Sequence, residues 1–305
     1  MDRFEALTAF VTVAERRGFA AAARALDVSP PVVTRAVAAL ERHLGVTLFH
    51  RSTRAVSLTD EGAAFLDRAR RILADLREAE QVVMGGRSAP RGQLYLTAPV
   101  MFGRMHVVPV VGALLAKHDG LSARMMLLDR NVRIIEEGID VAVRIGALAD
   151  SALRVVAIGS VQQTIVASPA YLADRGIPMS PGDLKVHSCI VGSGVRVGST
   201  WPFGDRGGNS GGDRGETAVE VVPRLTVNTV DAAIEAAEGG LGLANVLSYQ
   251  SAEAIAAGRL VRVLADHAPP PMPVNLLYDA GRAAMPSVRA FIDAMRERAR
   301  QKAWS

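Results

Sequence analysis

Apolar residues recur every three or four positions through most of the first 45 residues, in three runs separated at Gly18 and at Asp27-Val28. This spacing places the apolar side chains of each run on one side of a helix. The sequence therefore predicts three short helices with a sharp turn between the second and the third. The apolar positions of the first helix are Phe4, Leu7, Phe10, Val11 and Ala14, and those of the second are Ala21–Ala23, Ala25 and Leu26.

The third helix has a well-marked start and two different faces. Ser29 is a favourable N-cap residue, and Pro30 suits the first helical position because no backbone donor is needed there. A helix with an apolar inner face and a small, polar or cationic outer face fits the major groove of DNA when it is the second helix of a helix-turn-helix. The inner face carries Val33, Val37, Leu40 and Leu44, and the outer face carries Thr34, Arg35, Ala38 and Arg42.

A short basic hairpin follows the third helix. Arg51 and Arg54 flank Ser52 and Thr53, and these side chains suit the phosphates beside the groove. The positive charge is local, because the four arginines of this region are accompanied by a single acidic residue, Glu41. The chain is thus predicted to be a DNA-binding regulator.

Residues 59–84 carry a long helical pattern. An amphipathic helix lying on the surface of its own domain would show the same spacing. We favour a dimerising linker helix, because few residues here are left for a separate core and the pattern ends at Gly85-Gly86 and Pro90. The apolar positions of this seam are Leu66, Ala69, Leu73, Leu76 and Val83.

From Gln93 onwards, short β-like runs alternate with helical runs. Strands at 93–98, 123–128 and 140–145, joined by helices at 105–117 and 130–137, would form a βαβαβ unit and a parallel sheet. A second such unit begins at 164–167, and two α/β lobes joined by crossing strands would hold a ligand between them. We expect its helices at 169–176 and 230–238, strands at 188–191, 225–228, 241–246, 260–264 and 274–278, and a closing helix at 286–302.

The N-terminal residues resemble the winged helix-turn-helix of LysR-type transcriptional regulators. A looser resemblance continues after residue 90 in the runs 138–146, 168–172 and 239–242, in Asp183-Leu184 with His187, and in Trp201-Pro202-Phe203. The matching N-terminal positions are Phe10, Val13–Glu15, Phe19, Ala22–Leu26, Ser29, Thr34-Arg35, Leu40-Glu41, Leu44-Gly45, Leu48-Phe49, Arg51, Arg54 and Leu58–Gly62.

This resemblance implies an α/β chain with three parts. They are a winged helix-turn-helix over 1–59, a dimerising linker helix over 60–89, and an effector-binding domain over 90–305 that resembles periplasmic binding proteins. Its two lobes would comprise about 90–163 with 268–305, and 164–267. The chain departs from the family at Gly120, where a proline is common, and in the glycine-rich segment 204–215, where we expect a mobile hairpin tip.

The expected DNA contacts are Ser29, Pro30, Pro31, Val32, Thr34, Arg35, Arg51, Thr53 and Arg54. The family often has a polar residue such as glutamine at position 30, and proline neither reads a base edge nor donates a backbone N–H. Base readout should therefore shift to Val32, which suits a thymine methyl group, and to Thr34 and Arg35, of which arginine suits guanine. The arginines of the hairpin should contact the DNA backbone and the minor-groove edge.

The resemblance places the effector near Thr97, Pro99, Val100, Asp129, Arg144, Gly146, Asn228 and Thr229. Helix N-termini after Pro99 and Asn228, with cations at Arg130 and Arg144, favour a small anionic ligand. Arg144 has an alternative role, an internal ion pair with Asp140 or Asp129. Trp201 and Phe203 would line the second lobe or, as we favour, pack in its core.

Composition narrows the remaining possibilities. The chain has 305 residues, a net charge of +4, 49% hydrophobic and 22% charged residues, and one cysteine, Cys189, for which we favour a buried, inert thiol. We find no signal-peptide pattern, no membrane-length apolar run, no metal-ligand spacing and no nucleophile or nucleotide motif, so we expect a cytoplasmic protein without a cofactor that is not an enzyme.

The expected partners are double-stranded DNA, a small-molecule effector, further copies of this chain in a homodimer or tetramer, and RNA polymerase. The alternative is a stand-alone metabolite-binding protein without DNA function, in which the N-terminal helices serve assembly only.

Overall fold

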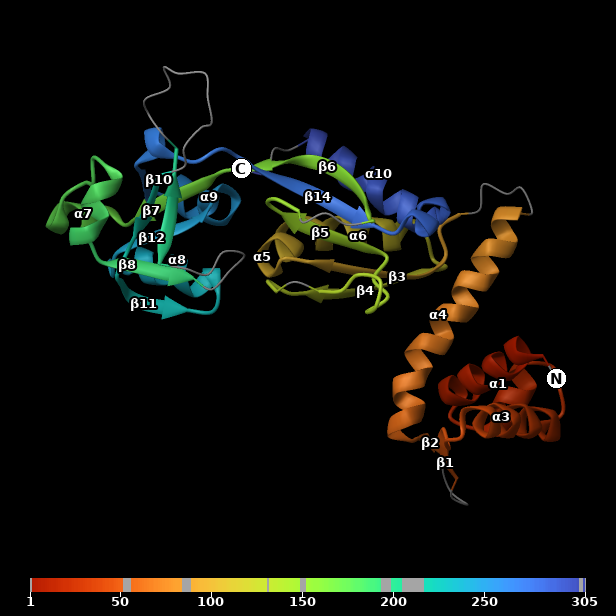
Figure 1. Ribbon diagram of the computed structural model, residues 1–305. Helices are drawn as coiled ribbons and strands as arrows, with labels where there is room; N and C mark the ends of the chain where they lie inside the picture. Colours follow the sequence, from red (N-terminus) through yellow and green to blue (C-terminus); the bar gives the residue numbers. More distant parts are fainter. Residues whose placement is uncertain are drawn as a thin grey trace. The chain divides into compact units, whose positions relative to one another are not determined.

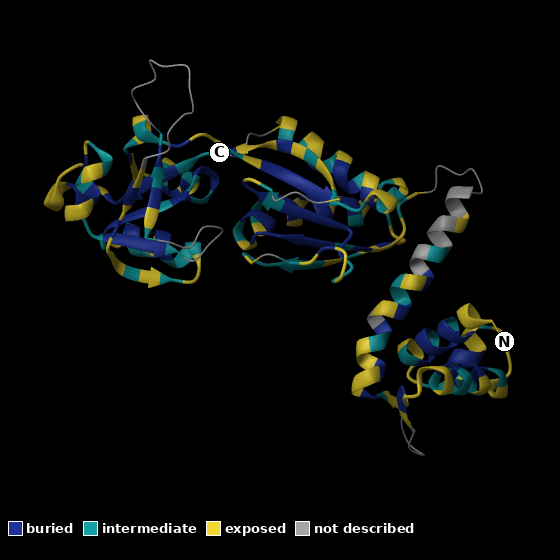
Figure 2. Ribbon diagram, viewed as in Figure 1, coloured by how far each residue is buried: buried dark blue, intermediate teal, exposed yellow. Residues whose placement is uncertain are grey.

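The computed structural model describes residues 2–51, 56–83, 89–130, 132–148, 152–192, 199–204, 217–301 and 304 (Figure 1). The chain divides into two compact units, Met1–Ser88 and Ala89–Ser305, and each is described by itself. Figure 2 shows that the buried positions are concentrated in the sheets and on the inner sides of the helices. Thr53, Arg54 and the predicted hairpin tip at 205–215 lie outside the described residues.

The first unit begins with three helices and a hairpin. These are α1 (Arg3–Arg16), α2 (Phe19–Ala25), α3 (Pro30–Leu44), and the antiparallel strands β1 (Phe49–Arg51) and β2 (Val56–Leu58). Phe10 is fully buried at the centre of the core, and its ring lies 5.3 Å from Phe49 and 5.5 Å from Phe65. The predicted turn is present, with Asp27 at a positive φ of 54°. Leu44, expected to be buried, is 37% exposed, because the chain turns away at Gly45.

The long helix α4 (Asp60–Val83) begins against this core. The buried Thr59 hydroxyl donates to the Thr47 carbonyl (2.8 Å) and accepts from the Gly62 N–H (2.9 Å), and a Cβ at Gly62 would collide with the Leu48 carbonyl. Arg70 also pairs with Glu15 of α1 at 3.1 Å. The start of α4 is thereby fixed on its own helix-turn-helix.

The predicted seam of α4 requires a correction. Leu66, Ala69 and Leu73 are buried in the core of the same unit, together with Phe10 and Val37. These three side chains are already packed within the chain and are not available to a partner helix. Ile72, which the predicted seam omits, is 43% exposed.

The first sheet of the second unit has the strand order β4-β3-β5-β14-β6. β3 pairs in parallel with β4 and β5, as predicted, whereas β14 runs antiparallel to β5 and β6. A continuous helical run and α10 (Pro286–Gln301) pack on this sheet, and the run consists of α5 (Val100–Phe102), the π-helix η1 (Gly103–Val107) and α6 (Val108–Lys117). The strands are β3 (Gly92–Ala98), β4 (Leu121–Leu127), β5 (Val141–Ile145), β6 (Arg154–Val161) and β14 (Met272–Tyr278).

The second sheet has the order β11-β8-β12-β7-β13. One face is covered by α7 (Pro169–Arg175), the 3-10 helix η2 (Pro181–Val186) and the hairpin of β9 (Thr200–Phe203) and β10 (Thr217–Glu220). α8 (Val230–Glu238) and α9 (Ser248–Ala256) cover the other face. The strands are β7 (Gln163–Ala167), β8 (Cys189–Gly192), β11 (Pro223–Val227), β12 (Leu243–Leu247) and β13 (Val261–Val263).

Several sequence predictions differ from this structure. The helix expected at 130–137 is a turn over 134–138, which closes through the Ile139 N–H and the Ile134 carbonyl (2.9 Å) and leaves no room for a further turn before β5. The first helical run begins at Val100 and not at 105. β7 is antiparallel to β12 and β13, so the second lobe does not repeat the βαβαβ order from its first strand. β6 and α9 were not predicted.

The run from Val100 to Lys117 is long and apolar enough, by composition alone, to cross a membrane, although no such span was expected from the sequence. Its side chains Phe102, Val107, Val110 and Leu114 are buried in the core against the first sheet and α10. This packing accounts for the apolar character of the run.

Candidate functional site

The N-terminus of α3 is open and carries no capping hydrogen bond. Ser29 has the extended backbone of an N-cap, as predicted, but its hydroxyl accepts no helix N–H. The reason lies in the next residues. Pro30 and Pro31 have no N–H, and the Val32 N–H bonds to the Ser29 carbonyl at 3.0 Å. The Ser29 side chain is therefore left exposed.

The outer face of α3 presents the predicted contact residues on a fixed helix. Val33, Val37 and Leu40 are buried beneath it. The Thr34 hydroxyl donates to the Pro30 carbonyl (3.0 Å), so its oxygen remains available as an acceptor, and the exposed Arg35 lies along the helix with Nε 3.4 Å from the Pro31 carbonyl. Ser29, Pro30 and Pro31 are exposed, and Val32 and Thr34 are half-buried.

The basic hairpin is anchored to α3 by an acidic residue whose role was not predicted. The Glu41 carboxylate accepts from the Leu48 N–H (2.8 Å) and the Phe49 N–H (3.3 Å), at the point where β1 begins. Arg51 ends β1 opposite Val56, while Thr53 and Arg54 lie outside the described residues. The presence of a lone acidic residue among arginines was the signal in the sequence that could have identified this anchor.

The helix N-terminus after Pro99 is already occupied. The Val100 N–H donates to the Asp129 carboxylate at 3.0 Å, so two predicted effector residues contact each other. Thr97, expected to contact the effector, is completely buried, and its hydroxyl donates to the Met126 carbonyl (2.8 Å) between β3 and β4. Thr97 therefore joins β3 and β4, the two strands that lead to Pro99 and Asp129.

Arg144 forms neither of the internal ion pairs considered for it. Asp140 instead pairs with Arg282 and accepts from the Tyr95 N–H. Across the described residues Arg144 has no ion-pair partner, and its Nη2 atom is buried without a hydrogen bond. Burial lowers the pKa of the Arg144 guanidinium, while the negative charges of Asp129 and Glu137 act in the opposite direction.

Gly146 follows Arg144 at a sharp turn of the chain. It is buried at a φ of 100°, a conformation that favours glycine, and its carbonyl accepts from the Asn275 amide at 3.5 Å. Asn275 lies opposite Arg144 in the register of β14 and β5. Gly146, Arg144 and Asp129 are thus brought to one end of the first sheet.

The remaining predicted residues lie at the start of α8 in the second lobe. The Thr229 hydroxyl caps this helix by accepting from the Ala232 N–H (3.4 Å), and Asn228 is exposed. One turn on, Asp231 lies 3.7 Å from Arg104 of η1. This contact between the lobes was not predicted.

Tyr249 lies near carboxylates of both lobes. Burial raises the pKa of its hydroxyl, and the negative charges of Asp129 and Asp231 raise it further. The carboxylates beside the two predicted effector segments therefore both act on this one tyrosine.

Trp201 and Phe203 pack in the core of the second lobe, as favoured from the sequence. Cys189 belongs to the same core, where burial raises the pKa of its thiol to about 11, which fits the inert role expected for it.

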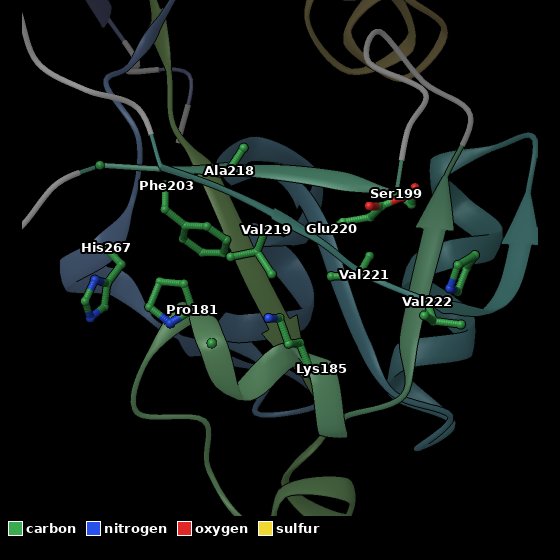
Figure 3. Close-up of a pocket in the computed structure, with 13 residues that line it drawn as sticks. Pro181, Lys185, Ser199, Phe203, Ala218, Val219, Glu220, Val221, Val222 and His267 are labelled. Carbon is green, nitrogen blue, oxygen red and sulfur yellow. The ribbon is translucent and has the colours of Figure 1, made fainter.

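A hollow of about 1030 Å³ lies beside this core, between η2 and β10 (Figure 3). Figure 3 shows the Lys185 side chain extending from η2 toward Val219 of β10. None of the predicted effector residues lines this hollow, so it is separate from the predicted site.

Comparison with known protein families identifies both units. The family of bacterial regulatory helix-turn-helix proteins, lysR family, matches residues 4–63, and the LysR substrate binding domain matches residues 87–300. The chain belongs to the LysR family of transcriptional regulators. It is therefore a LysR-type DNA-binding transcriptional regulator with a substrate-binding domain, and α3 and its hairpin lie within the DNA-binding part.

Similar proteins match nearly the whole LysR-type chain. The HTH-type transcriptional regulator PtxR of Pseudomonas aeruginosa is 34% identical over 291 residues, which cover 95% of this chain and 91% of that protein. The HTH-type transcriptional regulator CrgA of Neisseria meningitidis is 30% identical over 294 residues, 96% of each chain.

Solved structures give the same result. The structure of CrgA, a LysR-type transcriptional regulator, superposes with a TM-score of 0.61 at 30% identity and covers 97% of this chain and 98% of its own. The full-length Vibrio cholerae virulence activator AphB shares the fold, with a TM-score of 0.60 at 24% identity and coverage of 97% and 99%.

Proposed function

We propose that this LysR-type regulator binds a pseudo-palindromic operator as a homodimer or tetramer and responds to a small anionic effector. In this proposal the winged helix-turn-helix ends at residue 59, the linker helix spans 60–89, and the effector lies between the lobes of 90–305. Two-fold symmetry would place the half-sites about 34–36 Å, or a multiple of this, apart. RNA polymerase is the further partner proposed for the DNA-bound protein.

The proposed DNA contacts rest on the outer face of α3 and on its hairpin. Arg35 is exposed and suits the O6 and N7 atoms of guanine, whereas the half-buried Val32 and Thr34 suit a thymine methyl and a polar base edge. Ser29, Pro30 and Pro31 form the exposed end that would approach the groove first. Arg51, Thr53 and Arg54 are proposed to bind the backbone, which gives affinity with little sequence preference.

The proposed dimer contact on α4 keeps Leu76 from the predicted seam and adds Ile72, which that seam omits. Ile72 is exposed and Leu76 is half-buried, and the two are one helical turn apart. Leu66, Ala69 and Leu73 instead hold α4 on its own helix-turn-helix. Pairing two linker helices through Ile72 and Leu76 would leave that core intact.

The effector proposal rests chiefly on Arg144. Its Nη2 atom is buried without a hydrogen bond. The negative charges of Asp129 and Glu137 stabilise its positive charge without forming an ion pair with it. A carboxylate of the effector would supply the missing acceptor, and the exposed Val100 offers an apolar contact beside it. The proposed site is completed by Asp129, Gly146, Asn228 and Thr229. The buried Thr97 and Pro99 would support these residues from the protein interior.

Calorimetry with a panel of acidic, neutral and cationic metabolites tests this proposal on the full chain. The best-binding acid should lose at least tenfold in affinity in Arg144→Gln, because a hydrogen bond to a charged group contributes about 1.5–3 kcal/mol. Asp129→Asn should bind it more tightly, since a negative charge beside the site is removed. Arg133→Gln, an exposed arginine paired with Glu136, is the matched control and should behave as wild type. Binding of only neutral or cationic compounds would refute the anion proposal.

A further inference from the structure

The two lobes of the second unit are joined at a place where three parts of the chain meet. Gln162 connects β6 to β7, residues 268–271 lead back to β14, and Ser248 begins α9. The Gln162 side-chain amide donates to the Pro269 carbonyl, so one crossing segment is tied directly to the other. The Ser248 N–H donates to the Gln162 carbonyl at 2.7 Å.

Trp304, close to the end of the chain, completes this junction. The Ser248 hydroxyl accepts from the Gln162 N–H (3.2 Å) and donates to the Trp304 carbonyl (3.4 Å). The Trp304 indole N–H donates to the Ile158 carbonyl of β6 at 3.2 Å. Trp304 is only 3% exposed, so both of its hydrogen bonds lie in a nearly dry environment.

The indole also packs against two rings of the first lobe, which in turn contact a ring of the second. Its centroid lies 5.1 Å from Phe102 and 4.9 Å from His106, in the helical run of the first lobe. The same two rings each lie 5.4 Å from Tyr249 of α9 in the second lobe. Phe102 and His106 face these partners along the π-helical turn, a feature frequently found at functional sites.

Gly159 shows how closely the indole approaches β6. Its φ of 146° lies in the region that favours glycine, and an added Cβ would lie 2.6 Å from the Trp304 Nε1 atom. A side chain at this position would push the indole out of the junction. The glycine at position 159 therefore leaves room for the Trp304 indole against β6, the strand that leads from the first lobe to the second.

We propose that Trp304 is a positioning residue that holds the two lobes in one resting arrangement by wedging between β6 and the start of α9. This inference rests on the proposed function, because the arrangement matters through an effector that binds between the lobes. Such an effector acts only through different affinities for two arrangements, so the wedge sets the equilibrium that it shifts. The C-terminal end of the chain would thus determine how strongly the regulator responds.

Double electron–electron resonance on the full chain tests this inference without an effector. Spin labels are attached at Lys117→Cys in the first lobe and Lys185→Cys in the second, both exposed positions, and labelled chains are diluted with unlabelled protein. Cys189 is fully buried, and mass spectrometry checks that two labels attach. Wild type should give one narrow distance distribution, whereas Trp304→Ala should broaden or shift it.

Further variants separate positioning from simple loss of stability. Gly159→Ala, which keeps the tryptophan but displaces it, should broaden the distribution as Trp304→Ala does. Trp304→Phe keeps a ring but loses the N–H donor and should give an intermediate result. Trp201→Phe, in the core on the outer face of the second lobe, is the matched control and should leave the distribution unchanged.

An unchanged distribution in folded Trp304→Ala, or in Gly159→Ala, overturns the inference. A second measurement does not depend on how these variants fold. In Trp201→Phe, where Trp304 is the remaining tryptophan, emission should be blue-shifted and resistant to acrylamide, and solvent-exposed emission would also overturn the inference. A DNA gel shift on the same samples tests the proposed function separately. If wild type failed to bind DNA, the proposed function would fail, but the spin-label distances and the tryptophan emission would still test the role of Trp304.

Discussion

The recognition helix α3 and the helical run that begins at Val100 start in opposite ways. At α3, the first two residues are prolines without a backbone N–H, and the Ser29 hydroxyl makes no capping hydrogen bond. The exposed outer face of this helix therefore offers side chains for contact. At Val100, the first N–H is already held by the Asp129 carboxylate, close to a half-buried arginine. Under the proposed function, the first surface would meet DNA as it stands, whereas an effector at the second would have to rearrange existing contacts.

This difference suits the two tasks of a LysR-type regulator. DNA is a fixed polyanion, and exposed cations on a rigid helix bind it without a conformational change. A switch needs two arrangements of similar free energy, and under the proposed function the partly satisfied charge of Arg144 would favour a different arrangement once an effector binds. The predictions below test this contrast, beginning with the largest expected effect.

The largest effect should come from α4, where neighbouring positions have opposite environments. Leu73→Ala should destabilise the N-terminal unit by about 2–5 kcal/mol, because it leaves a cavity in a core that also holds Phe10. Ile72→Ala should change stability by less than about 0.5 kcal/mol, because its side chain is exposed in the single chain. Urea unfolding measures both.

The same helix tests assembly. Ile72→Glu should weaken dimerisation in sedimentation velocity while the unit remains folded. Equal destabilisation by Leu73→Ala and Ile72→Ala would contradict the packing of α4, and unchanged sedimentation of Ile72→Glu would exclude this face as the interface.

An intermediate effect is expected on the recognition helix. Arg35→Ala should weaken operator binding by about 1–3 kcal/mol and relax the preference at one base pair. Arg175→Ala, an exposed arginine on α7 of the second lobe, should bind as wild type. Fluorescence anisotropy with the operator and with single-base variants of it measures the change. A uniform loss over all sequences would assign Arg35 to phosphate contact instead.

A smaller effect compares two serine N-caps. Ser168 is buried and its hydroxyl accepts from the Tyr171 N–H at 3.3 Å, so Ser168→Ala should cost about 1 kcal/mol. Ser29→Ala should cost no more than a few tenths of a kcal/mol, because no capping hydrogen bond is lost. Thermal unfolding of the two variants checks this order, and a larger cost for Ser29→Ala would contradict the open start of α3.

The smallest effect concerns the carboxylate of the half-buried Asp183. It accepts from the Ser180 N–H (2.8 Å) and the Met179 N–H (2.9 Å), and these hydrogen bonds lower its pKa. Its stabilising contribution is therefore present above the unfolded pKa of about 3.9 and is lost as the pH falls through the folded pKa. The urea midpoint of wild type should exceed that of Asp183→Asn at pH 6, with the difference shrinking toward pH 3. A difference independent of pH would contradict the carboxylate's role.

The first unit was predictable from sequence because its signals are local. Helical spacing, the turn at Asp27 and the start at Ser29 each depend on neighbouring residues, and the structure confirms these elements. The effector side depends on partners far apart in sequence. The Asp129 carboxylate accepts a hydrogen bond from the Val100 N–H, and Asp140 forms an ion pair with Arg282. No spacing in the sequence indicates either contact.

The same limit explains the error in α4. Leu66, Ala69 and Leu73 were correctly read as a buried stripe, but periodicity does not say whether the partner is the same chain or another. Trp304 was passed over for a similar reason, since its role depends on a backbone carbonyl that only the fold brings close.

Selection from a randomised duplex library by the full-length protein tests the central claim most directly. We expect an enriched inverted repeat with half-sites separated by about one helical turn or a multiple of it. Its affinity should fall steeply with salt, and Arg35→Ala should relax one position of each half-site. Failure to enrich any sequence, or enrichment of the same site with equal affinity by Arg35→Ala, would contradict recognition through the outer face of α3.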